Sequence, residues 1–114
     1  MNERIEFIEQ AGGCVVSRNI LLHKGKLRWC VREESINSVD NGWRFLSDID
    51  TDEYLSDPNN MTICDFNTVA SIEPAIIALY DYPVGTDVEL VDDGKKKKFI
   101  DCKTGEEVNI DSII

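Results

Sequence analysis

Three carboxylates spaced two residues apart are the groups in this sequence best suited to bind a cation. Asp48, Asp50 and Asp52 match the first, third and fifth positions of a calcium-binding loop. The pattern fails at its decisive positions, because the sixth residue is Glu53 instead of glycine and the twelfth is Asn59 instead of a bidentate glutamate. We therefore expect a capped surface helix with solvated carboxylates, and no metal or cofactor.

The sequence offers little for nucleophilic catalysis. His23 is the only histidine, and it lies beside Lys24 and Gly25 in an expected turn. A histidine-assisted nucleophile needs a serine or cysteine within hydrogen-bond reach and a third group to orient the ring. Ser17 and Cys14 are near in sequence, but neither lies in a motif such as G-x-S-x-G, and no phosphate-binding glycine loop is present. We predict that the protein is not an enzyme; a deep polar pocket that brings acids to His23 would argue otherwise.

The two tryptophans lie beside arginines in strand-like segments. Arg28 precedes Trp29, and Arg44 follows Trp43. In one interpretation both indoles fill the core and the arginines pair with nearby acids, which is the commoner arrangement. In the other, one indole and its neighbouring guanidinium are exposed as an interface anchor, since Trp, Tyr and Arg are enriched at binding hot spots. Further aromatic candidates are Tyr54, Tyr80 and Tyr82.

The charge of the chain is strongly negative and unevenly distributed. Twelve Lys and Arg against 22 Asp and Glu give a formal net charge of −10, and 13 of the acids lie in residues 40–93 with a single basic residue, Arg44. Such a chain repels phosphate backbones, so we expect no nucleic-acid partner. An acidic surface either keeps a small protein soluble or attracts a cationic protein, and composition does not choose between the two.

Targeting and cysteine signals favour a cytoplasmic protein. No segment approaches the roughly 20 apolar residues of a membrane helix, so no membrane partner is expected. The first residues include acids where a signal peptide has a basic region. The cysteines form no C-x-x-C pair, which disfavours a zinc ribbon and predicts reduced, mostly buried thiols. These four residues are Cys14, Cys30, Cys64 and Cys102.

The first half of the chain predicts one short helix followed by strands. With 114 residues, the chain is expected to form a single domain, residues 1–114. Residues 2–10 suit a helix, and residues 14–22 and 27–32 suit a hairpin in which Leu27, Trp29 and Val31 share one face. A further strand is expected at residues 43–46, followed by one or two helical turns before Pro58.

The second half predicts a strand, a helix and a hairpin. Residues 61–72 alternate as a strand, and Ser71 is placed to cap a helix that begins with Glu73 and Pro74 and is over by Tyr82. The C-terminal hairpin, within about residues 87–110, pairs residues 88–91 with 97–100 around an Asp-Gly turn, with a third strand at 107–110. Together these elements predict an α+β fold with a mainly antiparallel sheet and two or three short helices.

Several segments, read in order, resemble a known family. The most distinctive portion is Arg32-Glu33, followed after a polar loop by Gly42-Trp43-Arg44-Phe45 and Asp52-Glu53-Tyr54. Asp65-Phe66-Asn67-Thr68-Val69-Ala70 and Pro83-Val84-Gly85-Thr86 continue the match. The chain resembles, over about residues 12–91, the small bacterial family first described as a domain of unknown function and later as immunity protein 33 of polymorphic toxin systems. Residues 1–11 and 95–114 lie outside the resemblance.

The resemblance implies a non-enzymatic protein that binds and neutralises a toxin domain. A basic toxin domain would fit the acidic middle of the chain. The alternative is a stand-alone ligand-binding or protein-binding regulatory domain without a toxin partner. The docking face that we predict consists of Asp48, Asp50, Asp52, Glu53, Tyr54 and Asp57, with Trp43 and Arg44 beneath or beside it.

Overall fold

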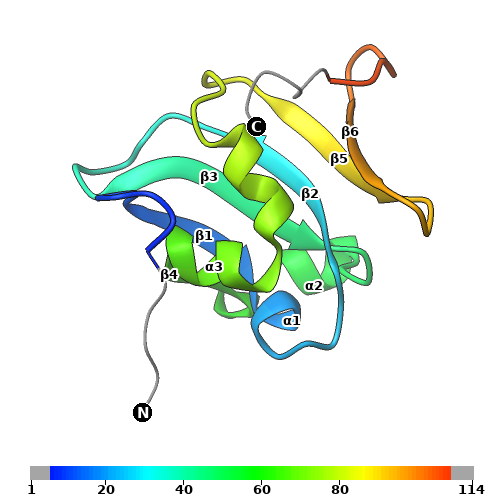
Figure 1. Ribbon diagram of the computed structural model, residues 1–114. Helices are drawn as coiled ribbons and strands as arrows, with labels where there is room; N and C mark the ends of the chain where they lie inside the picture. Colours follow the sequence, from blue (N-terminus) through cyan, green and yellow to red (C-terminus); the bar gives the residue numbers. More distant parts are fainter. Residues whose placement is uncertain (1–5, 109–114) are drawn as a thin grey trace.

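A six-stranded sheet with the order β4-β1-β3-β2-β5-β6 organises the protein (Figure 1). The structure is a computed structural model and describes residues 6–108. The strands are β1 (Gly13–Ser17), β2 (Leu27–Arg32), β3 (Asp40–Ser47), β4 (Met61–Asp65), β5 (Asp87–Asp92) and β6 (Lys97–Asp101). The helices are α1 (Arg18–Leu21), α2 (Asp52–Leu55) and α3 (Phe66–Ile72), with the 3-10 turns η1 (Pro58–Asn60) and η2 (Pro74–Leu79). All strand pairs are antiparallel except β1 with β3, which confirms the predicted α+β class.

The core lies between one face of the sheet and the layer formed by α3 and η2 (Figure 1). Trp43 and Phe45 of β3 have ring centroids 5.9 Å apart and nearly parallel planes. Phe66 of α3 lies 6.0 Å from the Phe45 ring and 5.0 Å from the ring of Tyr80, which follows η2. This line of aromatic rings ties the central strand to the helical layer, since such pairs add about 1 kcal/mol each beyond area burial.

The predicted inward face of β2 is wrong because the strand contains a bulge. Leu27 lies opposite Ser47 and Trp29 opposite Leu46, so two steps along β2 match one step along β3. One extra residue reverses the alternation of side chains between the two faces. Cys30 is therefore fully buried, whereas Trp29 is only partly buried, on the opposite face.

The predicted hairpin between residues 14–22 and 27–32 is also wrong. The first strand ends at Ser17, whose hydroxyl accepts a hydrogen bond from the N–H of Asn19 and caps α1. β3 is inserted between β1 and β2, and β1 pairs with β3 and β4. Helix α1 directs the chain away from β1, so residues 27–32 do not pair with β1.

The expected strand over residues 61–72 ends halfway, at Asp65. The Asp65 carboxylate accepts from the N–H of Asn67 and starts α3. Phe66, Val69 and Ala70 then follow the helical spacing and are fully buried. Glu73, and not Ser71, caps the next turn, η2, which is a 3-10 helix and ends at Leu79, before Tyr82 as expected. Helix capping therefore overrides the alternating pattern here.

The C-terminal hairpin is confirmed by the pairing of β5 with β6 around Gly94. Of the third strand, the described residues show an isolated bridge between Ile100 and Glu107; residues 109 and 110 lie outside them. Of the helix expected at 2–10, residues 6–10 form bends and turns, and residues 1–5 are not described. The strand at 43–46 and the short helix after it are confirmed as β3 and α2.

All four cysteines are free thiols, as expected. Cys14 and Cys30 are buried, Cys64 is partly buried and Cys102 is exposed. Burial raises the pKa of the Cys14 and Cys30 thiols well above the ordinary range, so both stay protonated and unreactive at neutral pH.

Candidate functional site

Asp50 is a structural acceptor inside the predicted docking segment. Its carboxylate accepts hydrogen bonds from the Ser17 hydroxyl (3.0 Å), the Asn19 amide (2.8 Å), and the N–H (2.7 Å) and hydroxyl (2.6 Å) of Ser47. Burial acts to raise the pKa of Asp50, but these hydrogen bonds outweigh it and lower the pKa. Asp50 thus joins the ends of β1 and β3, and its carboxylate is engaged within the fold.

Four other acids of that segment are exposed. Asp52 and Glu53 lie in the first turn of α2, which Thr51 caps, and Asp57 caps η1. Asp48 follows β3 and accepts from the N–H of Lys26 (2.9 Å). Within the described part of the chain, none of the four carboxylates forms an ion pair. We call Asp48, Asp52, Glu53 and Asp57 the acidic segment.

The aromatic residue of the segment is held by η1. The Tyr54 hydroxyl donates to the carbonyl of Asn60 (3.4 Å), and the Asn60 amide donates to the carbonyl of Tyr54 (2.7 Å). Both residues are partly buried. These two contacts fix α2 against η1, so the exposed carboxylates are carried on a braced loop.

Trp43 lies in the core and Arg44 points to the other face of the sheet. Trp43 is fully buried, and its indole N–H donates to the carbonyl of Tyr80 (3.3 Å). Arg44 donates to both Asp40 oxygens (2.9 Å each) and to Glu33 (3.1 Å). The first interpretation of the tryptophans therefore holds for Trp43. Trp43 lies within the fold, and Arg44 is about 13 Å along β3 from the start of the acidic segment, by strand rise.

The ion pair between Asp40 and Arg44 predicts that the fold loses stability in acid. Hydrogen bonds from Arg44, and from the N–H groups of Gly42 and Ile36, lower the pKa of Asp40 well below its usual range. The stability that this carboxylate supplies is therefore present above the unfolded pKa of about 3.9 and is lost as pH falls through the lower folded value. Asp40→Asn should cost about 2 kcal/mol at pH 7 and flatten the loss of stability below pH 5.

Chemical denaturation between pH 3 and pH 7 measures this effect. Asp81→Asn, at an exposed carboxylate, is the matched control and should follow the wild-type profile. Equal acid slopes for wild type and Asp40→Asn would contradict the assignment.

The other tryptophan lies on the sheet face opposite the core. Trp29 is partly buried there, and the Arg28 guanidinium carbon lies 5.0 Å from the centre of its ring. Arg28 Nε also donates to Glu89 (2.6 Å) on β5. Trp29 therefore lies outside the core, whereas Arg28 pairs with an acid, as the first interpretation expects of the arginines.

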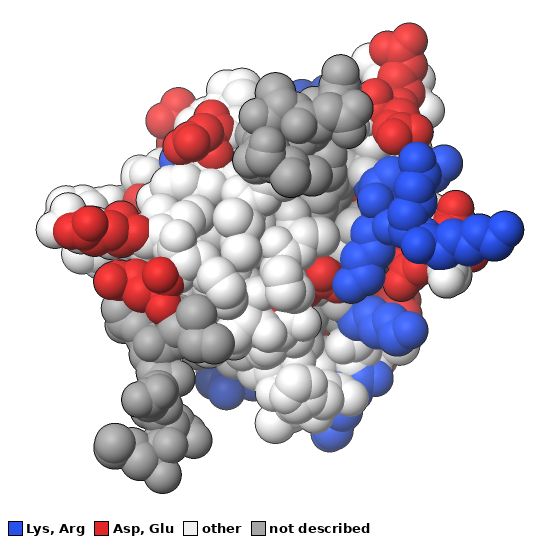
Figure 2. All heavy atoms as spheres, in the orientation of Figure 1, with Lys and Arg blue, Asp and Glu red and all other residues white. Residues whose placement is uncertain are grey.

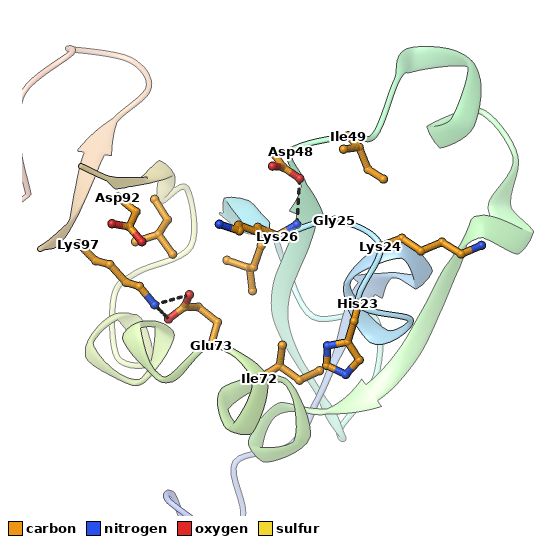
Figure 3. A pocket seen from close by; sticks show the side chains of 12 residues that line it. His23, Lys24, Gly25, Lys26, Asp48, Ile49, Ile72, Glu73, Asp92 and Lys97 are labelled. Carbon is orange, nitrogen blue, oxygen red and sulfur yellow. Dashed lines mark hydrogen bonds and ion pairs between the residues drawn. The ribbon is translucent and has the colours of Figure 1, made fainter. Parts of the chain in front are cut away.

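An open cleft of about 460 Å³ lies between the α1–β2 turn, the end of β3, the α3–η2 junction and the β5–β6 hairpin (Figure 3). Lys97 Nζ donates to both oxygens of Glu73 (2.9 and 3.0 Å) across it. His23 lines the cleft, and its ring lies beside Ile72 (Figure 3). The lining residues include no serine, threonine or cysteine, so the described cleft holds no hydroxyl or thiol for His23 to activate.

The pair formed by Glu73 and Lys97 was not predicted from the sequence. The signal was available, since Glu73 is the only charged residue between Phe66 and Tyr80. The Glu73 side chain is only 14% exposed, and a carboxylate so far buried needs a partner, which is Lys97, 24 positions away.

The described residues contain neither a candidate metal site nor a candidate membrane-spanning helix. No group of three or more His, Cys, Asp or Glu is placed to hold a metal ion in residues 6–108. In the same range, no helix has the length and hydrophobicity to cross a bilayer.

Comparison with known families identifies the fold unit that carries these residues. The sequence model described as the Immunity protein Imm33 domain matches residues 14–100. The chain belongs to the Imm33 immunity protein family. The match runs from β1 to β6 and therefore also covers Lys95–Lys98, which the resemblance left out. Neither a curated protein nor a solved structure matches this Imm33 chain.

Proposed function

We propose that this Imm33 protein is a non-enzymatic immunity protein that neutralises a bacterial toxin domain by binding it in the cytoplasm. The family match over residues 14–100 carries the proposal. The toxin belongs to a polymorphic toxin system and is encoded beside the immunity gene or delivered by a competitor. Inhibition by binding needs a preorganised surface of roughly 800 Å² and no reaction chemistry.

The acidic segment supports a cationic partner. Asp48, Asp52, Glu53 and Asp57 are exposed and free of ion pairs in the described structure, and the chain carries a formal charge of −10. The lysines are concentrated elsewhere: Figure 2 shows them over the β5–β6 hairpin, while the surface over α3 and η2 is nearly free of charge. Separated charge of this kind accelerates encounter with a basic protein and weakens with salt.

Charge reversal at two of these acids tests the docking face. The variant Asp52→Lys/Glu53→Lys should bind the toxin domain encoded by the neighbouring gene at least tenfold more weakly at low salt. The difference in affinity between this variant and wild type should become smaller at high salt, because salt screens the attraction. Asp50 is left unchanged, since its carboxylate holds β1 to β3. Binding is measured by calorimetry at two salt concentrations.

A matched control separates local docking from net charge. Asp81→Lys/Glu106→Lys makes the same change in charge at exposed sites outside the acidic segment and should stay within threefold of wild type. Equal losses in both variants would reject the acidic segment as the docking face. A wild-type protein that does not bind the toxin domain would reject the immunity function and favour a stand-alone binding domain.

A further inference from the structure

The two edges of the sheet differ in how they are protected. At the β6 edge, the N–H of Val108 donates to the carbonyl of Phe99 (2.8 Å), and Lys97 and Lys98 lie on the strand. Lysines and covering chain are the usual protection of an edge strand. At the other edge, β4 pairs with β1 on one side and has no neighbouring strand on its other side among residues 6–108.

The backbone N–H and C=O of Ile63 point out of this open edge of the sheet. The N–H of Phe66 donates to the carbonyl of Gly12 (2.9 Å), which makes Gly12 and Phe66 a hydrogen-bonded pair. Such pairs alternate along an antiparallel ladder, so Cys14 and Cys64 form the next one. Val15 and Ile63 follow as the next, non-hydrogen-bonded pair, so the N–H and C=O of Ile63 point away from β1. These are the groups that an added strand would pair with.

The side chains around this edge are the most exposed apolar ones in the described structure. Ile63 is 73% exposed, Ile36 72% and Val39 68%. All three line the same small hollow, together with Val15 of β1. We call Ile36, Val39, Ile63 and Val15 the edge patch. Pro58 and Met61 continue it along β4 beside Val15 and Ile63. Exposed apolar clusters of this kind mark interaction surfaces.

The charges around the edge patch favour a positively charged binding partner. Asp57 caps the turn that begins with Pro58, which lines the hollow beside Met61 and Ile63, and its carboxylate forms no ion pair among the described residues. Of the nearby cations, Arg44 is neutralised by Asp40 and Glu33. Arg18 donates to the carbonyl of Asn59 (2.6 Å) and forms no ion pair among the described residues, but the four carboxylates of the acidic segment outnumber it. A second copy would bring another formal charge of −10 to this edge, so the surroundings favour a cationic strand over a second copy.

We propose that the open edge of β4 accepts an extended basic segment of the toxin domain as a seventh strand of the sheet. Apolar side chains of that segment pack on the edge patch, and its lysines or arginines face Asp57. The inference rests on the proposed immunity function, because it names the surface with which this Imm33 protein binds its toxin.

Two substitutions at Ile63 test the docked strand with the toxin domain encoded by the neighbouring gene. Ile63→Lys places a cation in the patch, and Ile63→Pro removes only an N–H that does not serve β1, a position where edge strands tolerate proline. Both should weaken binding at least tenfold and keep the wild-type circular dichroism spectrum. Val84→Lys, at a 50% exposed apolar residue of the loop after η2, is the matched control and should bind within twofold of wild type. Hydrogen exchange should show the Ile63 amide protected in the wild-type complex.

Each result separates this inference from the function on which it rests. If wild type binds the toxin domain and both Ile63 variants bind within twofold of it, or if the Ile63 amide stays unprotected, the docked strand is wrong and the immunity function stands. If wild type does not bind, both fail. If sedimentation shows a wild-type dimer that Ile63→Lys dissociates, a second copy occupies the edge and the inference is overturned.

Discussion

Gly42→Ala should destabilise the fold by about 4 kcal/mol, from backbone strain and overpacking together. Gly42 has φ +90°, and a Cβ atom built there would lie 2.2 Å from the carbonyl oxygen of Glu33. That carbonyl cannot easily withdraw, because the Glu33 N–H donates to the carbonyl of Gly42 (2.8 Å) and joins the ends of β2 and β3. Urea denaturation followed by tryptophan fluorescence measures the loss, since Trp43 is the next residue and is fully buried.

Gly94 provides a matched control for this substitution. It has the same φ of +90°, in the β5–β6 turn, but a Cβ atom there meets nothing within 4 Å. Gly94→Ala therefore carries the left-handed backbone penalty alone, about 1 kcal/mol. The difference between the two variants isolates the contact with Glu33. Equal losses of stability in the two variants would show that the β2–β3 junction relaxes and that the contact with the Glu33 carbonyl adds no further cost.

Elements with local partners were predictable from sequence. β5 and β6 are joined by a short turn with Asp93 and Gly94, so pairing, register and turn all follow from one stretch of chain. β3 shows buried and outward residues in alternation, with Trp43 and Phe45 inward and Arg44 outward. In both cases the residues that decide the structure lie within a few positions of one another.

Elements with distant partners were not predictable. β1 pairs in parallel with β3, and no local pattern specifies that β3 rather than β2 lies next to it. The bulge in β2 shifts Cys30 into the core, and only the register against β3 reveals it. After Asp65 the sequence continues the alternation that is typical of a strand. The chain instead forms α3, because Asp65 caps the helix and its buried residues follow helical spacing.

The same distinction between local and distant partners holds for the candidate site. The spacing of acids predicted exposed carboxylates correctly for Asp48, Asp52, Glu53 and Asp57. It could not predict the role of Asp50, because two of its donors, Ser17 and Asn19, come from 33 and 31 positions away. The edge patch likewise joins residues from three separate segments, and only the order of strands brings them together.

The Arg32 side chain joins three parts of the fold. Its Nε donates to the carbonyl of Asn41 (2.9 Å), and its Nη1 to the carbonyls of Tyr80 (3.1 Å) and Tyr82 (2.7 Å). The guanidinium carbon also lies 5.7 Å from the centre of the Trp43 ring. The end of β2 is thereby tied to the start of β3 and to the loop after η2.

Arg32→Met should therefore cost about 3 kcal/mol, because it keeps the apolar stem and removes all three donors to partly buried carbonyls. Arg32→Lys should recover only part of this, since an ammonium group cannot reproduce the planar fork. Arg28→Met is the matched control: Arg28 also lies over an indole and pairs with an acid, but its side chain is 46% exposed, so the loss should stay below about 1 kcal/mol. Equal urea midpoints for Arg32→Met and Arg28→Met would show that solvent replaces the three hydrogen bonds and that Arg32 is not what fixes the η2 loop to the sheet.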